Sequence, residues 1–176
     1  GHDYSLTTLL GGDGELAARF TGGQFATLYL SPRDYHRIHM PCSGRLQETV
    51  YVPGRLFSVA PHTVRAINGL FTRNERLVAC FDTASGPMAV VMVGAIFVSC
   101  METVWDGIVN PHMGMTRQSR QFGGNGPELP GGAELGRFNM GSTVILLYGP
   151  GQADWGESLA AGQAVRMGQQ IGSLCR

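Results

Sequence analysis

The chain has 176 residues, of which 43% are hydrophobic and 15% charged, so a disordered polypeptide is excluded and one domain with a substantial core is expected. Its thirteen basic residues are all arginines, and thirteen acidic residues balance them. This zero net charge predicts no nucleic-acid partner and no strongly electrostatic attachment to anionic membranes. Because lysine is absent, the chain itself cannot hold pyridoxal phosphate through the usual lysine Schiff base.

Apolar stretches rich in β-branched and aromatic residues predict most of the secondary structure. They are Phe25–Leu30, Leu46–Val52, Leu77–Phe81, Met88–Val98 and Thr143–Tyr148. Gly94, inside the fourth stretch, indicates a bulge or a close approach of the backbone. With 26 glycines and 9 prolines the chain has many turns. We therefore predict a mainly β fold, an antiparallel sandwich or partly closed barrel with a few short helices, in a single catalytic domain over residues 1–176.

Helix signals are few. Gly12–Phe20 fits a short helix, and Ser31 followed by Pro32 predicts one or two helical turns over Pro32–Arg37. Asn110–Gly132, with six glycines and three prolines, predicts a long surface loop. Glu157–Ile171 fits a helix, or in part a hairpin strand.

The cysteines at positions 42, 80, 100 and 175 form no C-x-x-C pair and no zinc spacing, so we expect free thiols and no metal site. The longest apolar run, Met88–Val98, is too short to cross a bilayer as a helix.

Two histidines in the segment SPRDYHRIHMPCSG are candidates for acid–base chemistry. His36 and His39 are three residues apart, so on a short helix they would share a face. They would serve either as a pair of proton-transfer groups or as hydrogen-bonded structural residues. Zinc binding is disfavoured because no further ligand has a suitable spacing.

Gly141 and Ser142 open the last predicted strand, within the string FNMGST. Such a tripeptide is commonly a polar turn that enters a strand. Ser142 does not lie in a G-x-S-x-G elbow, which argues against a conventional serine hydrolase of the α/β-hydrolase type.

Taken together, the ordered strings SPRDYHRIHMP, VPGRLFSV, FTRNERLV and the late GST resemble the phosphatidylserine decarboxylase family. The resemblance implies that the chain cleaves itself between Gly141 and Ser142, into a β chain of residues 1–141 and an α chain of residues 142–176. Met140 replaces the leucine that usually precedes the glycine, a volume-conserving change.

The resemblance also implies the chemistry. The Ser142 hydroxyl attacks the Gly141 carbonyl and turns the amide into an ester, with His39 as the base for self-cleavage. Elimination and hydrolysis then leave a covalent pyruvoyl group at residue 142. This ketone accepts electrons as phosphatidylserine loses carbon dioxide and becomes phosphatidylethanolamine, and His36 assists decarboxylation and protonation.

In the family an aspartate upstream of the segment GHDYSL orients the self-cleavage histidine, and a chain that begins at Gly1 lacks it. We expect either a fragment of a longer protein or a substitute carboxylate such as Asp34, and we expect the chain alone to mature slowly. Leu56 and Phe57 line the lipid site or simply pack. The resemblance further implies a homodimer of β/α pairs on the cytoplasmic side of the cell membrane.

Three alternatives remain. The enzyme could act on a different amine-bearing substrate, the chain could be a non-catalytic lipid-binding remnant in which Ser142 never matures, or Ser142 could be a hydrolase nucleophile.

Overall fold

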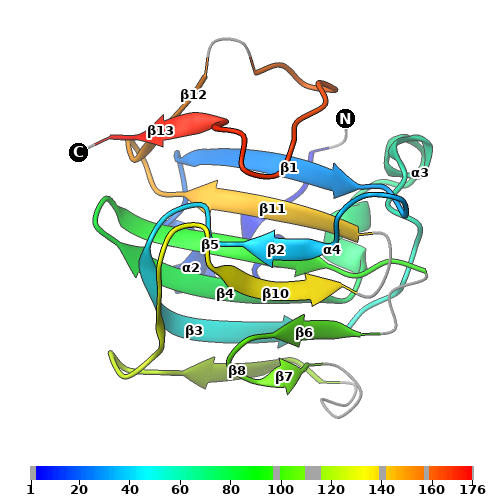
Figure 1. The fold of residues 1–176 in the computed structure, drawn as a ribbon. Coiled ribbons are helices and arrows are strands. Elements are labelled where there is room, and N and C mark those ends of the chain that lie inside the picture. The colour runs from blue at the N-terminus through cyan, green and yellow to red at the C-terminus, as the bar shows by residue number, and fades with distance from the viewer. Residues whose placement is uncertain (1–2, 97–99, 110–115, 139–141, 157–158, 176) are drawn as a thin grey trace.

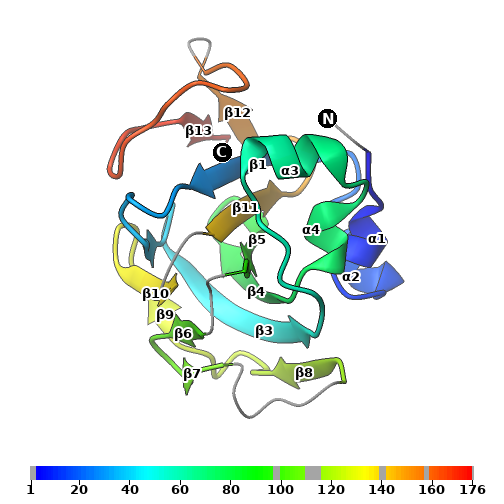
Figure 2. The ribbon, with the colours of Figure 1, turned by 90° about the vertical axis from the view of Figure 1, so that its right-hand side faces the viewer.

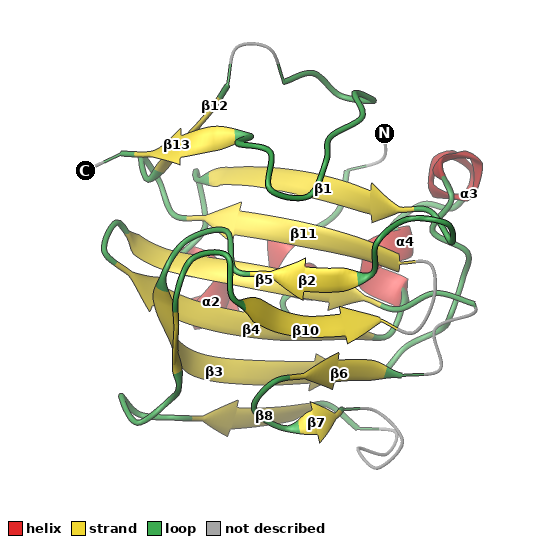
Figure 3. Ribbon diagram, in the orientation of Figure 1, coloured by secondary structure: helices red, strands yellow, loops and turns green. Residues whose placement is uncertain are grey.

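The computed structural model describes residues 3–96, 100–109, 116–138, 142–156 and 159–175. Figures 1 and 3 show a mainly β molecule built on a seven-stranded antiparallel sheet. In spatial order this large sheet contains β1 (Gln24–Leu30), β11 (Ser142–Tyr148), β5 (Gly86–Val93), β4 (Arg76–Thr83), β3 (Gly44–Val52) and β8 (Gln118–Gln121), and β9 (Glu128–Leu129) also pairs with β3.

A second, smaller sheet faces the large one. It contains β2 (Arg37–His39), β10 (Glu134–Phe138), β6 (Met101–Thr103) and β7 (Gly107–Ile108), and a separate hairpin joins β12 (Ala153–Trp155) to β13 (Gly172–Leu174). Helices α1 (Leu6–Leu9), α2 (Gly14–Ala18) and α4 (Leu70–Arg73) lie on the other face of the large sheet, and α3 (Pro61–Ala66) lies at one end of it (Figure 2). The predicted antiparallel sandwich with a few short helices is confirmed, and the described strands form no closed barrel.

The central strands of the large sheet are apolar because both of their faces are covered. Every residue of β11 is buried, as are Met88–Val93 of β5 and Arg76–Phe81 of β4. Strands covered on both faces are typically continuous apolar runs, which is why these stretches were predicted correctly. The fourth predicted strand, Met88–Val98, was too long: β5 ends at Val93, and residues 97–99 lie outside the described residues.

The predicted helical turns over Pro32–Arg37 were wrong. Asp34 N donates to Ser31 O (2.8 Å) in a single turn, and the chain then extends into β2. Arg37 and Ile38 pair with β10, so the ladder of the small sheet takes the backbone groups that a helix would have used. His36 and His39 consequently share no helix face.

The predicted loop Asn110–Gly132 also needs correction, since it contains the strands β8 and β9 on the edge of the large sheet. Within Glu157–Ile171 the described residues form turns and no helix or strand. The helix predicted within Gly12–Phe20 is α2, whose N-cap Asp13 accepts from Leu16 N (3.0 Å). The sequence reading missed α1, α3 and α4. No helix among the described residues is long and apolar enough to cross a membrane.

The cysteines are free thiols in very different environments. Cys80 is fully buried on β4, and burial, reinforced by nearby Glu48, raises the pKa of its thiol to about 12. Cys175 is exposed near the C-terminus. Since only the accessible thiolate is nucleophilic, iodoacetamide at pH 8 should label Cys175 in the folded protein and leave Cys80 unlabelled. Peptide mass spectrometry checks this result, and equal labelling would contradict the placement of β4. Labelling in urea is the control.

Candidate active site

The candidate site lies where the chain passes twice between the two sheets. Residues 31–36 connect β1 to β2, and residues 139–141 connect β10 to β11. Leu30, the last residue of β1, is paired with Ser142, the first residue of β11. At the small sheet, Phe138 N donates to His36 O (3.0 Å). The two connections are therefore tied together at both ends, and one of them carries the Gly141–Ser142 bond. Gly141 and Met140 lie outside the described residues.

Ser142 is completely buried, and its hydroxyl oxygen has no hydrogen-bond partner. Buried hydroxyls are rarely left unpaired, because an unsatisfied polar group costs about 1–3 kcal/mol. Thr143 Oγ1 is also buried and unpaired. Such an orphaned group indicates either stored strain or chemistry at the start of β11.

The Ser142 side chain points into the space between the sheets. Along β11 side chains alternate, so Ser142 and Tyr148 face the same way. Tyr148 is paired with Met88, and Met88 with Phe81, whose ring packs edge-on against Trp105 of the β6–β7 turn (centroids 6.1 Å apart). Because paired residues of antiparallel strands share a face, Ser142 faces the small sheet.

His36 lies at the same junction and holds a free base atom. Its Nδ1 is 2.5 Å from Asp34 O. A carbonyl only accepts hydrogen bonds, so Nδ1 carries the proton and Nε2 is the basic nitrogen of the neutral ring. Nε2 is buried and has no partner. Two unpaired buried groups, a hydroxyl and an imidazole nitrogen, thus belong to adjoining segments of one junction.

His39 lies farther from the junction. It is paired with Glu134 at the opposite end of β10, three residues beyond His36, which corresponds to roughly 10 Å along a strand. Its Nδ1 is 2.8 Å from Gly132 O, and its Nε2 is 2.8 Å from the hydroxyl of Tyr35, which also stacks on the ring. His36 is therefore hydrogen-bonded to Phe138 at the end of β10 that leads to Ser142, whereas His39 pairs at the other end of β10.

Asp34 does not contact the ring of His39. Its carboxylate accepts from Ser31 N (2.8 Å) and so closes the turn in which it lies. The partner of His39 Nδ1 is a backbone carbonyl, at the position where the family resemblance leads one to expect a carboxylate. Among the described residues, no group of three or more histidine, cysteine or acidic side chains could hold a metal ion.

Sequence reasoning missed a buried polar cluster beside the junction. Asn74 is fully buried: its Oδ1 accepts from Phe57 N (3.1 Å), and its Nδ2 donates to Phe57 O (2.9 Å) and Gly94 O (2.8 Å). Gly94 N donates to Glu75 O (2.9 Å). Thr143 is paired with Val93, so the register places Gly94 beside Ser142. The expected close approach at Gly94 is therefore present, and the string FTRNER, which contains Asn74, was the available signal.

Glu75 and Tyr51 belong to the same face of the sheet as Ser142. Tyr51 donates to Glu75 Oε1 (2.6 Å), and both residues are buried. Burial, followed by the hydrogen bond to Glu75 and its charge, raises the pKa of the Tyr51 hydroxyl above its ordinary value. Tyr51 consequently stays protonated and remains a donor to the carboxylate.

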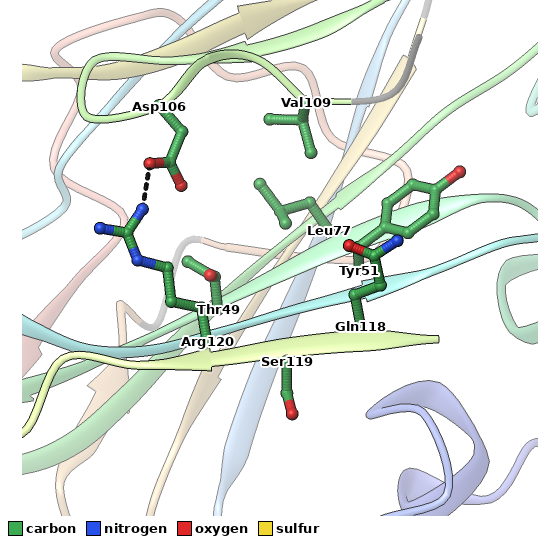
Figure 4. Close-up of a pocket in the computed structure, with 8 residues that line it drawn as sticks. All are labelled: Thr49, Tyr51, Leu77, Asp106, Val109, Gln118, Ser119 and Arg120. Atoms are coloured by element: carbon green, nitrogen blue, oxygen red, sulfur yellow. Dashed lines mark hydrogen bonds and ion pairs between the residues drawn. The ribbon is translucent and has the colours of Figure 1, made fainter. Parts of the chain in front are cut away.

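Two surface pockets lie elsewhere in the molecule. One, of about 150 Å³, lies between β3 and β8 on one side and the β6–β7 turn on the other, next to the ion pair between Arg120 and Asp106 (2.5 Å; Figure 4). The other, of about 270 Å³, adjoins β12 and β13. Neither is lined by Ser142, His36 or His39, so the candidate site is defined by the hydrogen bonding of its junction.

Comparison of the sequence with known proteins identifies the family. The sequence profile of the phosphatidylserine decarboxylase family matches residues 1–173. The chain is 58% identical over 175 residues to the phosphatidylserine decarboxylase proenzyme of Ectopseudomonas mendocina, covering 98% of this chain and 61% of that protein. The corresponding proenzymes of Bordetella avium (55% over 175 residues; 97% and 58%) and Pseudomonas putida strain F1 (57% over 173 residues; 97% and 60%) are similar. The chain spans about three fifths of the length of these curated relatives. It belongs to the phosphatidylserine decarboxylase family.

Proposed function

We propose that this chain carries the catalytic centre of a pyruvoyl-dependent decarboxylase that converts phosphatidylserine to phosphatidylethanolamine after cutting itself at Gly141–Ser142. One observation carries the proposal. Ser142 follows Gly141 at the start of β11, fully buried and with no partner for its hydroxyl. Family membership supplies the reaction class, because the relatives are named phosphatidylserine decarboxylase proenzymes.

The first step of self-cleavage, conversion of the amide to an ester, needs three things from the chain. The Ser142 oxygen must attack the carbonyl carbon of Gly141, a base must take the hydroxyl proton, and that proton must pass to the departing nitrogen. A hydroxyl that lacks a competing hydrogen bond is available for the attack. A glycine on the acyl side offers no Cβ that would obstruct it.

We assign His39 as the self-cleavage base and His36 as the group that assists decarboxylation, as the family resemblance implies. In the described conformation His36 Nε2 is free at the junction, whereas Tyr35 occupies His39 Nε2. For His39 Nε2 to act as a base, its hydrogen bond with the Tyr35 hydroxyl has to break. This requirement, and the carbonyl on His39 Nδ1, support slow maturation of the chain.

The cofactor in this proposal is the pyruvoyl group formed from Ser142 itself, and its ketone would supply the electron sink for loss of carbon dioxide. The orphaned hydroxyl of Ser142 fits such an origin, because no other described group depends on it. His36 Nε2 would hold or deliver a proton beside the same position. The inter-sheet location would exclude water from the reacting atoms.

The further parts of the proposal are a β chain of residues 1–141 that stays with an α chain of residues 142–176, a homodimer of such pairs, and a peripheral position on the cytoplasmic side of the cell membrane. The pairing of β1 with β11 supports the first, because seven residues of β11 are held by β1 on one side and six by β5 on the other. Cutting before Ser142 would leave both ladders in place.

Intact-mass spectrometry tests the proposal. We expect fragments of 141 and 35 residues, the smaller one reacting with a hydrazine reagent that captures ketones. The preparation should release carbon dioxide from phosphatidylserine vesicles and not from free serine. An uncut chain that binds phospholipid without consuming it would favour the alternative, a non-catalytic lipid-binding remnant of the family.

Two histidine variants separate the assigned roles. His39→Ala should slow self-cleavage by roughly 10²–10⁴-fold, because loss of a general base has about that effect. His36→Ala should still be cut but should lose decarboxylation. The time course of cleavage and carbon dioxide release from each variant are the measurements, with Met167→Ala, at a position that is 58% exposed, as the control. The opposite pattern would assign the base to His36, whose Nε2 is already free at the junction.

A further inference from the structure

The stretch from Thr49 to Asn74 has an unusual charge. It contains Arg55, Arg65 and Arg73 and no aspartate or glutamate, although the whole chain carries thirteen residues of each sign. The zero net charge of the whole chain therefore does not reflect the positive charge of this segment. It includes helix α3, none of whose residues is buried. Val64 packs against the core from one side of this helix, and Arg65 on the same helix is exposed.

Arg55 and Arg73 are held next to each other by the backbone. Arg55 N donates to Arg73 O, and Glu75 N donates to Arg55 O, both at 2.8 Å. Both arginines are exposed, and neither belongs to any of the ion pairs among the described residues. The guanidinium of Arg73 lies 4.9 Å from the centre of the Phe57 ring. We call the surface formed by Arg55, Leu56, Arg73 and α3 the basic face.

The basic face adjoins the Ser142 junction. Asn74 fixes the backbone of Phe57 to the Gly94 carbonyl, and the register places Gly94 beside Ser142. Leu56 Cδ2 would lie 3.3 Å from a Cβ placed on Gly94, so Leu56 packs directly over this position. Figure 2 shows α3, α4 and the beginning of β11 at the same end of the molecule.

We propose that the basic face is the surface on which this chain meets a phospholipid bilayer with anionic headgroups. The inference rests on the proposed function, because a lipid substrate keeps its acyl chains in the bilayer and presents only its headgroup to Ser142. Exposed arginines attract lipid phosphates. Leu56, which is 37% exposed, adds apolar surface that enters the interface. The charge and the apolar contact thus occur together where the substrate has to arrive.

Co-sedimentation with vesicles tests the charged part of the proposal. The full chain should bind vesicles of phosphatidylcholine mixed with phosphatidylglycerol, an anionic lipid without the substrate amine, and binding should weaken as salt is added. The double variant Arg55→Gln/Arg73→Gln should bind about 30-fold more weakly, roughly five-fold for each arginine. Arg45→Gln/Arg166→Gln removes the same charge from exposed positions outside the face and should cost less than about three-fold. Equal losses in the two double variants would overturn the proposal.

A second measurement locates the bilayer on the chain by the fluorescence of a single introduced tryptophan. Leu56→Trp should be quenched by brominated lipids in anionic vesicles. Met167→Trp, at a position that is 58% exposed outside the basic face, should not be quenched. The background from Trp105 and Trp155 is measured in the unsubstituted chain. Quenching at position 167 alone would show that the bilayer contacts another surface of the chain. Quenching at neither position would show that the basic face does not contact the bilayer.

The outcomes separate this inference from the proposed function. If the ketone forms at residue 142 and Arg55→Gln/Arg73→Gln binds vesicles as the unsubstituted chain does, the membrane surface is wrong and the proposed function stands. If Arg55→Gln/Arg73→Gln alone loses vesicle binding and no preparation forms the ketone, the membrane surface stands and the proposed function is wrong.

Discussion

Ser142→Ala should leave the chain as a single uncut polypeptide with no ketone, whereas the unsubstituted chain yields fragments of 141 and 35 residues. The alanine lacks the oxygen that attacks the Gly141 carbonyl, so no ester forms and no pyruvoyl group follows. The effect is a complete loss, because no neighbouring group can supply an oxygen at the same position. Intact-mass spectrometry before and after treatment with a hydrazine reagent is the measurement.

The folded state should survive this change. Ser142 Oγ makes no hydrogen bond, so its removal leaves no partner unsatisfied and costs only a small packing defect. The melting temperature of Ser142→Ala should therefore equal or exceed that of an uncut unsubstituted chain. Ser173→Ala, in β13, is the matched control and should mature like the unsubstituted chain. Continued cleavage at position 142 in Ser142→Ala would exclude the proposed function.

Arg76→Leu should destabilise the fold more than any other single arginine replacement. Arg76 lies on β4, is 2% exposed and donates to the carbonyls of Leu9, Thr8, Thr72 and Asn74 at 2.6–2.9 Å. Burial lowers the pKa of its guanidinium to about 10, so the group stays charged at neutral pH. It thereby joins the end of α1 and the end of α4 to the large sheet. Leucine leaves these buried carbonyls without a donor.

Unsatisfied carbonyls cost about 1–3 kcal/mol each when no water reaches them, and a loss of roughly 3–5 kcal/mol is expected for the set. For a chain of this length the melting temperature should then fall by roughly 6–20 °C. Arg45→Leu, at an exposed ion pair with Glu128, should change stability by less than about 1 kcal/mol. Thermal unfolding followed by circular dichroism compares the two variants. Equally small decreases in the melting temperature of both variants would show that the hydrogen bonds of Arg76 do not stabilise the fold.

Much of the β architecture could be predicted from the amino-acid sequence. Stretches such as Leu77–Phe81 and Thr143–Tyr148 are apolar and β-branched because both faces of their strands are covered, and this composition is visible in the chain itself. The family resemblance depended on rare strings in a fixed order, and those strings are a property of sequence alone. Ser142 and the two histidines were accordingly identified before any geometry was known.

Local signals failed where pairing partners are distant in sequence. Ser31 and Pro32 are good helix-start residues, but the backbone groups of Arg37 and Ile38 pair with β10, a hundred residues later. The edge strands β8 and β9 were hidden for the same reason. Their residues are exposed or only partly buried, so hydrophobic alternation is weak, and β3 supplies the hydrogen bonds that order them.

The sequence by itself determined the class of fold, the Gly141–Ser142 bond as the centre of interest, and the family. Only the tertiary structure decided that His36 is hydrogen-bonded to Phe138 at the end of β10 while His39 pairs at its other end, and that an acid-free surface adjoins the Ser142 junction. The physical reason is register. Which residues meet across a sheet depends on hydrogen-bonded pairing between distant strands, and a one-residue slip would reverse every face. Composition and spacing along the chain contain no direct record of that pairing.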